Sequence, residues 1–145
     1  MINSSLMTWQ SWAFLSAVFA ALTAIFAKIG VSDINSDMAT LIRTVIILGV
    51  LALIVLATGQ WQELLGIASR TWLFLTLSAL ATGASWVCYF RALKIGDAAR
   101  VAPVDKLSIV LVAMFGVLIL GERLSATNWL GVGLCTAGIV LVPMR

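Results

Sequence analysis

The stretch "VAPVDKLSIVLVAMFGVLILGERLS", residues 101–125, contains the features on which the fold of this chain depends. Most of it is apolar enough to cross a membrane, yet Pro103, Asp105 and Lys106 lie within the apolar run. A charged residue at the centre of a bilayer costs about 2.5–3.5 kcal/mol even on insertion scales. The charged pair must therefore lie near water or face a polar interior.

The composition of the whole chain indicates an integral membrane protein. The chain has 145 residues, of which 62% are hydrophobic and 10% are charged, whereas soluble domains average about 25% charged residues. The nine basic residues are scattered singly, so we expect no nucleic-acid partner. With no His and two isolated cysteines, Cys88 and Cys135, we expect no metal, no cofactor and no catalytic constellation, and therefore not an enzyme.

Five apolar runs have the length expected of membrane-spanning helices. They cover residues 11–29, 38–58, 71–90, 98–120 and 127–142. A membrane β-barrel would need alternating segments of about ten residues, and these runs are continuous. We therefore predict an all-α membrane protein, with residues 1–145 forming a single domain of five transmembrane helices in the cell membrane.

The third run carries a polar stripe. Ser78, Thr82, Ser85 and Tyr89 follow one another at steps of four, three and four residues, and Trp86 lies beside them. This spacing places the hydroxyl groups on one side of a helix. Such hydroxyls can bond back to their own helix or join neighbouring helices, but a stripe with two aromatic residues also fits the lining of a ligand cavity.

The fourth run allows two interpretations of its charged pair. If the helix begins after Asp97, that residue caps it and Asp105 lies well inside the span. Asp105 would then need a partner such as Arg43, in the second run, or Lys106. If the helix begins at Pro103 instead, Asp105 lies in the first turn, where a carboxylate suits the helix dipole. Both interpretations remain open at this point.

The fifth run has a face of small residues. Gly131, Cys135 and Gly138 recur at steps of four and three residues. Small residues allow helix backbones to approach closely, which favours association in lipid. We therefore expect this face to pack against another helix, in a dimer or within the bundle.

The C-terminal part of the chain resembles a known family. Residues 89–142, "YFRALKIGDAARVAPVDKLSIVLVAMFGVLILGERLSATNWLGVGLCTAGIVLV", are similar to the EamA domain of the drug/metabolite transporter superfamily. The likeness lies in the "YFRALKIGDA" hinge, the early Pro103, the "LGERLS" turn and the Gly-rich last helix. The first three runs match the family in number and spacing.

The resemblance implies a membrane transporter of small organic metabolites. Family members commonly contain two five-helix repeats of inverted topology around a central cavity, and this sequence holds one repeat. Because five is odd, tandem repeats face opposite ways and the substrate site forms between them. We therefore expect one half of an inverted-repeat transporter, working by alternating access as an exporter or exchanger. Its partner would be a second copy, antiparallel in one arrangement, or a related five-helix protein.

Charges within and beside the spans predict orientation and substrate. Five basic residues are expected at one membrane face, namely Lys28, Arg91, Lys94, Arg100 and Arg145, against Arg70 and Arg123 at the other. The positive-inside rule then predicts a cytoplasmic C-terminus. Embedded cations outnumber embedded acids, which favours an anionic or zwitterionic substrate. The expected cavity lining is Ser78, Thr82, Ser85, Trp86, Tyr89, Pro103, Asp105, Lys106 and Arg43. A scaffold or accessory subunit without transport of its own is the alternative function.

Overall fold

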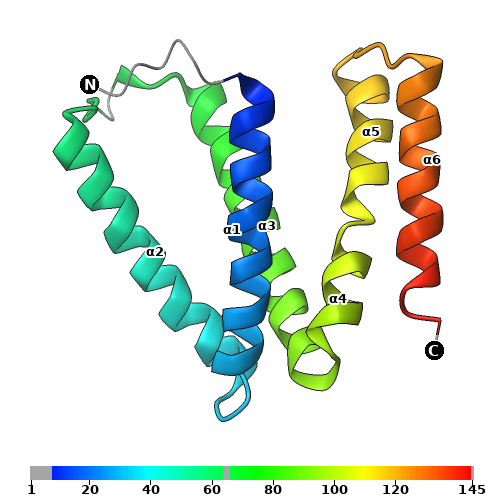
Figure 1. Cartoon of the computed structure of the whole chain (residues 1–145). Helices are drawn as coiled ribbons and strands as arrows, with labels where there is room; N and C mark the ends of the chain where they lie inside the picture. The colour runs from blue at the N-terminus through cyan, green and yellow to red at the C-terminus, as the bar shows by residue number, and fades with distance from the viewer. Residues whose placement is uncertain (1–7, 64–65, 145) are drawn as a thin grey trace. The chain divides into compact units, whose positions relative to one another are not determined.

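The computed structural model describes residues 8–63 and 66–144, and within them the chain forms helices and no strands (Figure 1). The helices are α1 (Trp9–Gly30), α2 (Ser36–Thr58), α3 (Ser69–Ile95), α4 (Ala98–Asp105), α5 (Ser108–Ile119) and α6 (Ala126–Leu141). The predicted all-α fold is therefore confirmed. The expected fourth helix, residues 98–120, is formed by two consecutive helices, α4 and α5.

Among the described residues, four helical segments are long and apolar enough to cross a membrane. They are α1, α2, α3 and the segment Ala98–Ile119 formed by α4 and α5. The fifth, α6, has 16 residues and is about 24 Å long at 1.5 Å per residue, shorter than the roughly 30 Å hydrocarbon core. Most large apolar side chains on these helices are exposed. That surface needs lipid or another protein to cover it.

Helix α2, which lines one side of the candidate site, has well-formed ends. At its N-terminus the side-chain oxygen of Asn35 accepts a hydrogen bond from the amide of Asp37 at 2.8 Å, and the Asp37 carboxylate lies in the first turn, where the helix dipole favours it. At its C-terminus Gly59 adopts a φ of 65°. The amide of Gln60 donates to the carbonyl of Val55 at 3.1 Å, as in a Schellman motif.

The segment that contains Pro103 begins at Ala98, with Asp97 at the N-cap position. The interpretation in which the helix begins at Pro103 is therefore wrong, and Pro103 lies inside α4. The Asp97 side chain makes no capping hydrogen bond, so its predicted capping role is not met. Proline lacks an amide hydrogen and crowds the carbonyl four residues earlier, and α4 ends at Asp105, two residues further on.

The connection between α5 and α6 is a tight turn. Gly121 has a φ of 69°, a conformation that favours glycine, and the amide of Glu122 returns to the carbonyl of Gly116 at 3.0 Å. Ser125 then caps α6, because its hydroxyl accepts a hydrogen bond from the amide of Asn128 at 3.2 Å. The "LGERLS" sequence is thus a helix stop followed directly by a helix start.

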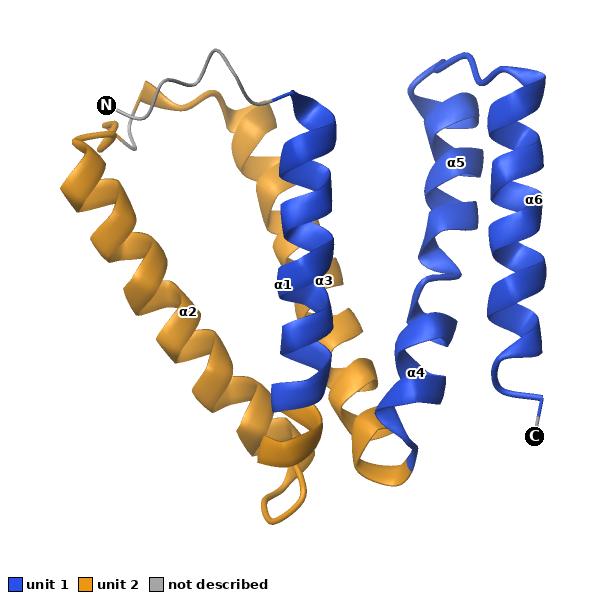
Figure 2. Ribbon diagram, viewed as in Figure 1, with its two compact units in different colours: residues 1–26, 96–145 blue, residues 27–95 orange. Residues whose placement is uncertain are grey.

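The chain divides into two compact units, coloured separately in Figure 2. Unit 1 comprises residues 1–26 and 96–145, and within it α6 packs against both α4 and α5. Unit 2 comprises residues 27–95 and contains α2 and α3, which pack against each other. The loop between residues 30 and 36 joins the end of α1 to α2 within unit 2.

The buried residues of unit 2 lie near the start of α2 and the end of α3. Val31 and Leu93 are 1% and 0% exposed, and Phe90 is 3% exposed. Two lysines support this region: Lys28 donates to the carbonyl of Leu93 at 2.7 Å, and Lys94 donates to the carbonyl of Ile34. These contacts hold the loop before α2 against the C-terminal part of α3.

Candidate functional site

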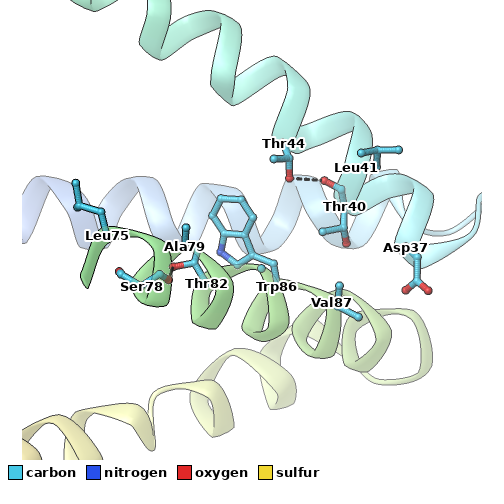
Figure 3. Close-up of a pocket in the computed structure, with 11 residues that line it drawn as sticks. Asp37, Thr40, Leu41, Thr44, Leu75, Ser78, Ala79, Thr82, Trp86 and Val87 are labelled. Atoms are coloured by element: carbon cyan, nitrogen blue, oxygen red, sulfur yellow. Dashed lines mark hydrogen bonds between the residues drawn. The ribbon is translucent and has the colours of Figure 1, made fainter. Parts of the chain in front are cut away.

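A pocket of about 610 Å³ lies between α2 and α3 in unit 2 (Figure 3). Its described lining residues are Asp37, Thr40, Leu41, Thr44, Leu75, Ser78, Ala79, Thr82, Gly83, Trp86 and Val87. The first four belong to α2 and the others to α3. The volume is within the range of about 300–1,000 Å³ that is typical of small-molecule sites.

Four hydroxyl groups line the pocket, two from each helix. The hydroxyls of Thr40, Thr44 and Thr82 each donate to the backbone carbonyl four residues earlier, at 2.8–2.9 Å. This is the back-bonding considered for the third run, and it satisfies each proton within its own helix. The threonine oxygens keep lone pairs that can accept hydrogen bonds, and Ser78 supplies the fourth hydroxyl.

Trp86 is the large aromatic residue of the pocket, and its ring extends from α3 toward α2 (Figure 3). On α2, the guanidinium carbon of Arg43 lies 4.3 Å from the centroid of the Trp86 ring and 5.5 Å from that of Phe90. A cation over an aromatic face is stabilised by roughly 0.5–1 kcal/mol at exposed sites and by about 2 kcal/mol when it is desolvated. Arg43 therefore contacts a lining residue of the pocket, although it is not itself among the described lining residues.

An ion pair lies at one end of the pocket, where Asp37 is a lining residue. The Arg91 Nε donates to Asp37 Oδ1 at 3.0 Å, and Nη2 donates to Oδ2 at 2.7 Å. This two-point geometry is the strongest arrangement between a guanidinium and a carboxylate. The side chains of Arg91 and Asp37 are 62% and 49% exposed, so both groups remain accessible.

The predicted polar stripe on the third run only partly coincides with this pocket. Ser78, Thr82 and Trp86 line it, whereas Ser85 and Tyr89 are not among its described lining residues. At about 100° per residue, Trp86 is displaced by about 80° from Ser78 around the helix. The pocket is centred nearer to Trp86 than to the stripe. The Tyr89 ring instead contacts Phe90 edge to face, with centroids 6.4 Å apart.

The remaining predicted lining residues, Pro103, Asp105 and Lys106, belong to unit 1. The Lys106 Nζ donates to Asp105 Oδ2 at 3.2 Å, so the neighbouring charges pair with each other. They lie where α4 ends and the chain turns into α5. Broken spans are tolerated at membrane depth only where protein or a water-filled cavity surrounds the break.

The small-residue face of α6 is open in unit 1. A side-chain carbon placed on Gly131 or Gly138 would meet no described atom within 4 Å, and Cys135 is exposed. Arg145, which contributes to the predicted orientation, lies outside the described residues. Among the residues that the structure describes, no group of three or more His, Cys, Asp or Glu could hold a metal ion.

Comparison with known proteins identifies the family. The model of the EamA-like transporter family matches residues 7–144, nearly the whole chain. The chain belongs to the EamA-like transporter family. It is therefore a multi-pass membrane protein of a transporter family, as the resemblance in its C-terminal part implied.

A relative supports the same assignment of this EamA-like protein. A Sinorhizobium sp. protein named "Uncharacterized transporter in cobO 3'region" is 70% identical over 137 residues, covering 94% of this chain and 97% of the relative. The relative is thus about as long as this chain. No solved structure matches the EamA-like chain.

The α2 residues that line the pocket were missing from the sequence-based prediction for this EamA-like protein, which named only Arg43 from this helix. Asp37, Thr40 and Thr44 line the pocket, and Arg91, counted only as a topology charge, pairs with Asp37. A signal was present in the spacing, because Asp37, Thr40 and Thr44 recur at steps of three and four residues. That periodicity indicates a polar stripe at the start of the second span.

Proposed function

We propose that this EamA-like protein is a secondary transporter of small organic metabolites, and that the α2–α3 pocket is the part of the substrate site contributed by one five-helix unit. The observation that carries this proposal is the pocket itself. Hydroxyl groups from two membrane-length helices and the ring of Trp86 line one volume of about 610 Å³. Few polar groups in an otherwise apolar pocket are typical of small-molecule sites.

The transporter acts as a dimer of five-helix units, in this proposal. An inverted-repeat transporter forms its site between two units of opposite orientation, and this chain supplies one unit. The relative from Sinorhizobium sp., which is named a transporter, aligns with this chain over 97% of its own length. The open face of Gly131, Cys135 and Gly138 offers a surface for the second copy or for a related five-helix partner.

Transport follows alternating access, driven by a gradient of substrate or of a coupling ion, and it serves export or exchange. The pocket would open to one side of the membrane at a time as one unit rocks against the other. The charge distribution supports a cytoplasmic C-terminus in most copies. A second copy of opposite orientation would therefore require part of the protein to insert the other way, whereas a related five-helix partner would not. Reporter fusions at the C-terminus test this orientation: signals mainly outside the cell would contradict it, and equal signals on both sides would indicate dual topology.

Purified protein reconstituted into liposomes tests transport directly. Uptake of a panel of labelled small organic acids, amines and amino acids is compared with uptake by empty liposomes. We expect Trp86→Leu to reduce the flux of any transported compound at least tenfold, because it removes the aromatic surface of the pocket. Trp72→Leu is the matched control, since Trp72 also belongs to α3 but is not a described lining residue.

The alternative function, a scaffold or accessory subunit, predicts a different result. A folded protein that gives no flux above empty liposomes with any compound, alone and with its partner, would favour that alternative. Equal flux by wild type and Trp86→Leu would support transport but would show that the substrate does not pass through this pocket.

A further inference from the structure

Asp37 is the single charged side chain among the described lining residues of the α2–α3 pocket. A pocket with one accessible carboxylate would ordinarily select a cation, because an opposite charge lowers the cost of desolvating the ligand. Each oxygen of this carboxylate, however, accepts a hydrogen bond from the guanidinium of Arg91, at 3.0 and 2.7 Å. The carboxylate is therefore neutralised at the place where it lines the pocket.

A second guanidinium lies beside the same pocket without such neutralisation. Arg43 is half-buried on α2 and lies 4.3 Å from the ring centroid of Trp86. Arg43 takes part in neither the Arg91–Asp37 nor the Lys106–Asp105 ion pair. Taken together, Asp37, Arg91 and Arg43 thus carry one positive charge in excess.

We propose that the pocket selects a small organic anion with an apolar body, and that Arg91 sets this selectivity by masking Asp37. This inference rests on the proposed function and names the substrate class of the same site. The carboxylate or similar acidic group of the ligand would meet the excess positive charge, since guanidinium groups suit planar anions. The apolar body would lie against Trp86 and the aliphatic lining residues.

If Arg91 masks Asp37, substitutions of the two residues should shift the charge preference of the pocket in opposite directions. Arg91→Gln leaves the Asp37 carboxylate unpaired in the pocket, so anions are repelled and cations are favoured. Asp37→Asn leaves the guanidinium of Arg91 unpaired, so anions are favoured more strongly. In the double variant neither charge remains, and the preference should return toward that of wild type. An ion pair that merely stabilises the fold would give both single variants the same direction of effect.

Three probes of similar shape measure the preference: benzoate as the anion, benzamide as the neutral compound and benzylammonium as the cation. Equilibrium binding is measured on the full chain in mild detergent, and flux is measured in liposomes. We expect wild type to bind benzoate more tightly than the other two. Arg91→Gln should lower the benzoate to benzylammonium affinity ratio by about tenfold or more, as unfavourable charge juxtapositions are costly.

Two control variants separate masking from simple loss of positive charge. Lys94→Gln removes a cation from the same end of α3 but exposes no carboxylate, because Lys94 donates to the backbone of Ile34. It should leave the affinity ratio within about twofold of wild type, since no charge in the pocket changes. Arg43→Gln should weaken benzoate binding. Arg70→Gln is its control, because Arg70 also stacks on an aromatic ring, that of Phe74, and this variant should leave benzoate binding unchanged.

The outcomes distinguish this inference from the proposed function. Binding with the predicted charge preference but without flux would support the inference and contradict transport. Flux or binding that favours benzylammonium in wild type would overturn the inference and leave transport standing. Absence of binding by all three probes, or a shift of Arg91→Gln and Asp37→Asn in the same direction, would also overturn it. If Arg91→Gln does not fold, the increase expected for Asp37→Asn remains a test.

Discussion

Lys106 donates its backbone amide to the carbonyl oxygen of Pro103 at 2.9 Å, three residues earlier in the chain. An uninterrupted α-helix would bond that amide to the carbonyl four residues earlier. The next amide, that of Leu107, likewise donates to Val104, three residues back, at 3.0 Å. The fourth span is therefore tightened into a short turn between α4 and α5, and the Asp105–Lys106 pair lies at this turn.

We expect Pro103→Ala to make the fourth span more continuous. An alanine restores an amide donor and removes the ring that crowds the preceding turn, a change worth up to about 3 kcal/mol in a helix interior. The variant should raise the melting temperature and slow hydrogen exchange at residues 105–109. Pro143→Ala, beyond the end of α6, is the control and should change neither. Unaltered exchange in Pro103→Ala would mean that the turn has another cause.

The end of α2 gives a prediction about a single glycine conformation. Gly59 has a φ of 65°, which a side chain disfavours, so Gly59→Ala should destabilise the protein by about 1 kcal/mol. Gly49 lies inside the same helix with open space around it, and Gly49→Ala should stabilise by about 0.5–1 kcal/mol. Thermal unfolding in detergent compares the two. Shifts of the same sign would contradict the Schellman ending of α2.

Dimer formation through α6 is tested by filling its small-residue face. Gly131→Leu and Gly138→Leu have room in the isolated chain, because neither glycine has a described atom near its side-chain position. Each variant should therefore fold, yet block close helix approach in the proposed dimer. Gly133→Leu places the same bulk on another face of α6 and should leave the dimer intact. Crosslinking in membranes and light scattering in mild detergent measure the oligomeric state. If both test variants form dimers as wild type does, this face is not part of the dimer interface.

The Asp105–Lys106 pair gives a prediction that separates function from folding. Their side chains pair with each other at 3.2 Å and both are accessible, so each charge can be removed with little effect on stability. We expect Asp105→Asn and Lys106→Gln to assemble normally and to change the rate of transport, because the pair lies at a break in a membrane span. If both variants transport like wild type, the pair serves only the local helix geometry.

Several features of this protein follow from local sequence. The apolar segments and their place in a membrane depend on the length of each apolar run, which is set by adjacent residues alone. The placement of Ser78, Thr82 and Trp86 near one side of α3 follows from helical periodicity in the same way. The start of the fourth span was ambiguous, because Asp97 and Pro103 are both residues typical of a helix N-terminus.

Other features were decided by tertiary structure. Arg91 and Asp37 are 54 residues apart in the chain, and no local pattern pairs them. Ser85 and Tyr89 share a stripe with Ser78, but the side of α3 that borders the pocket is centred nearer to Trp86. Periodicity shows which residues share a face of a helix, whereas the rotation of that face toward a neighbouring helix depends on how the side chains of both helices fit together. That fit brings Asp37, Thr40 and Thr44 of α2 opposite Trp86, and it determines which charges the pocket contains.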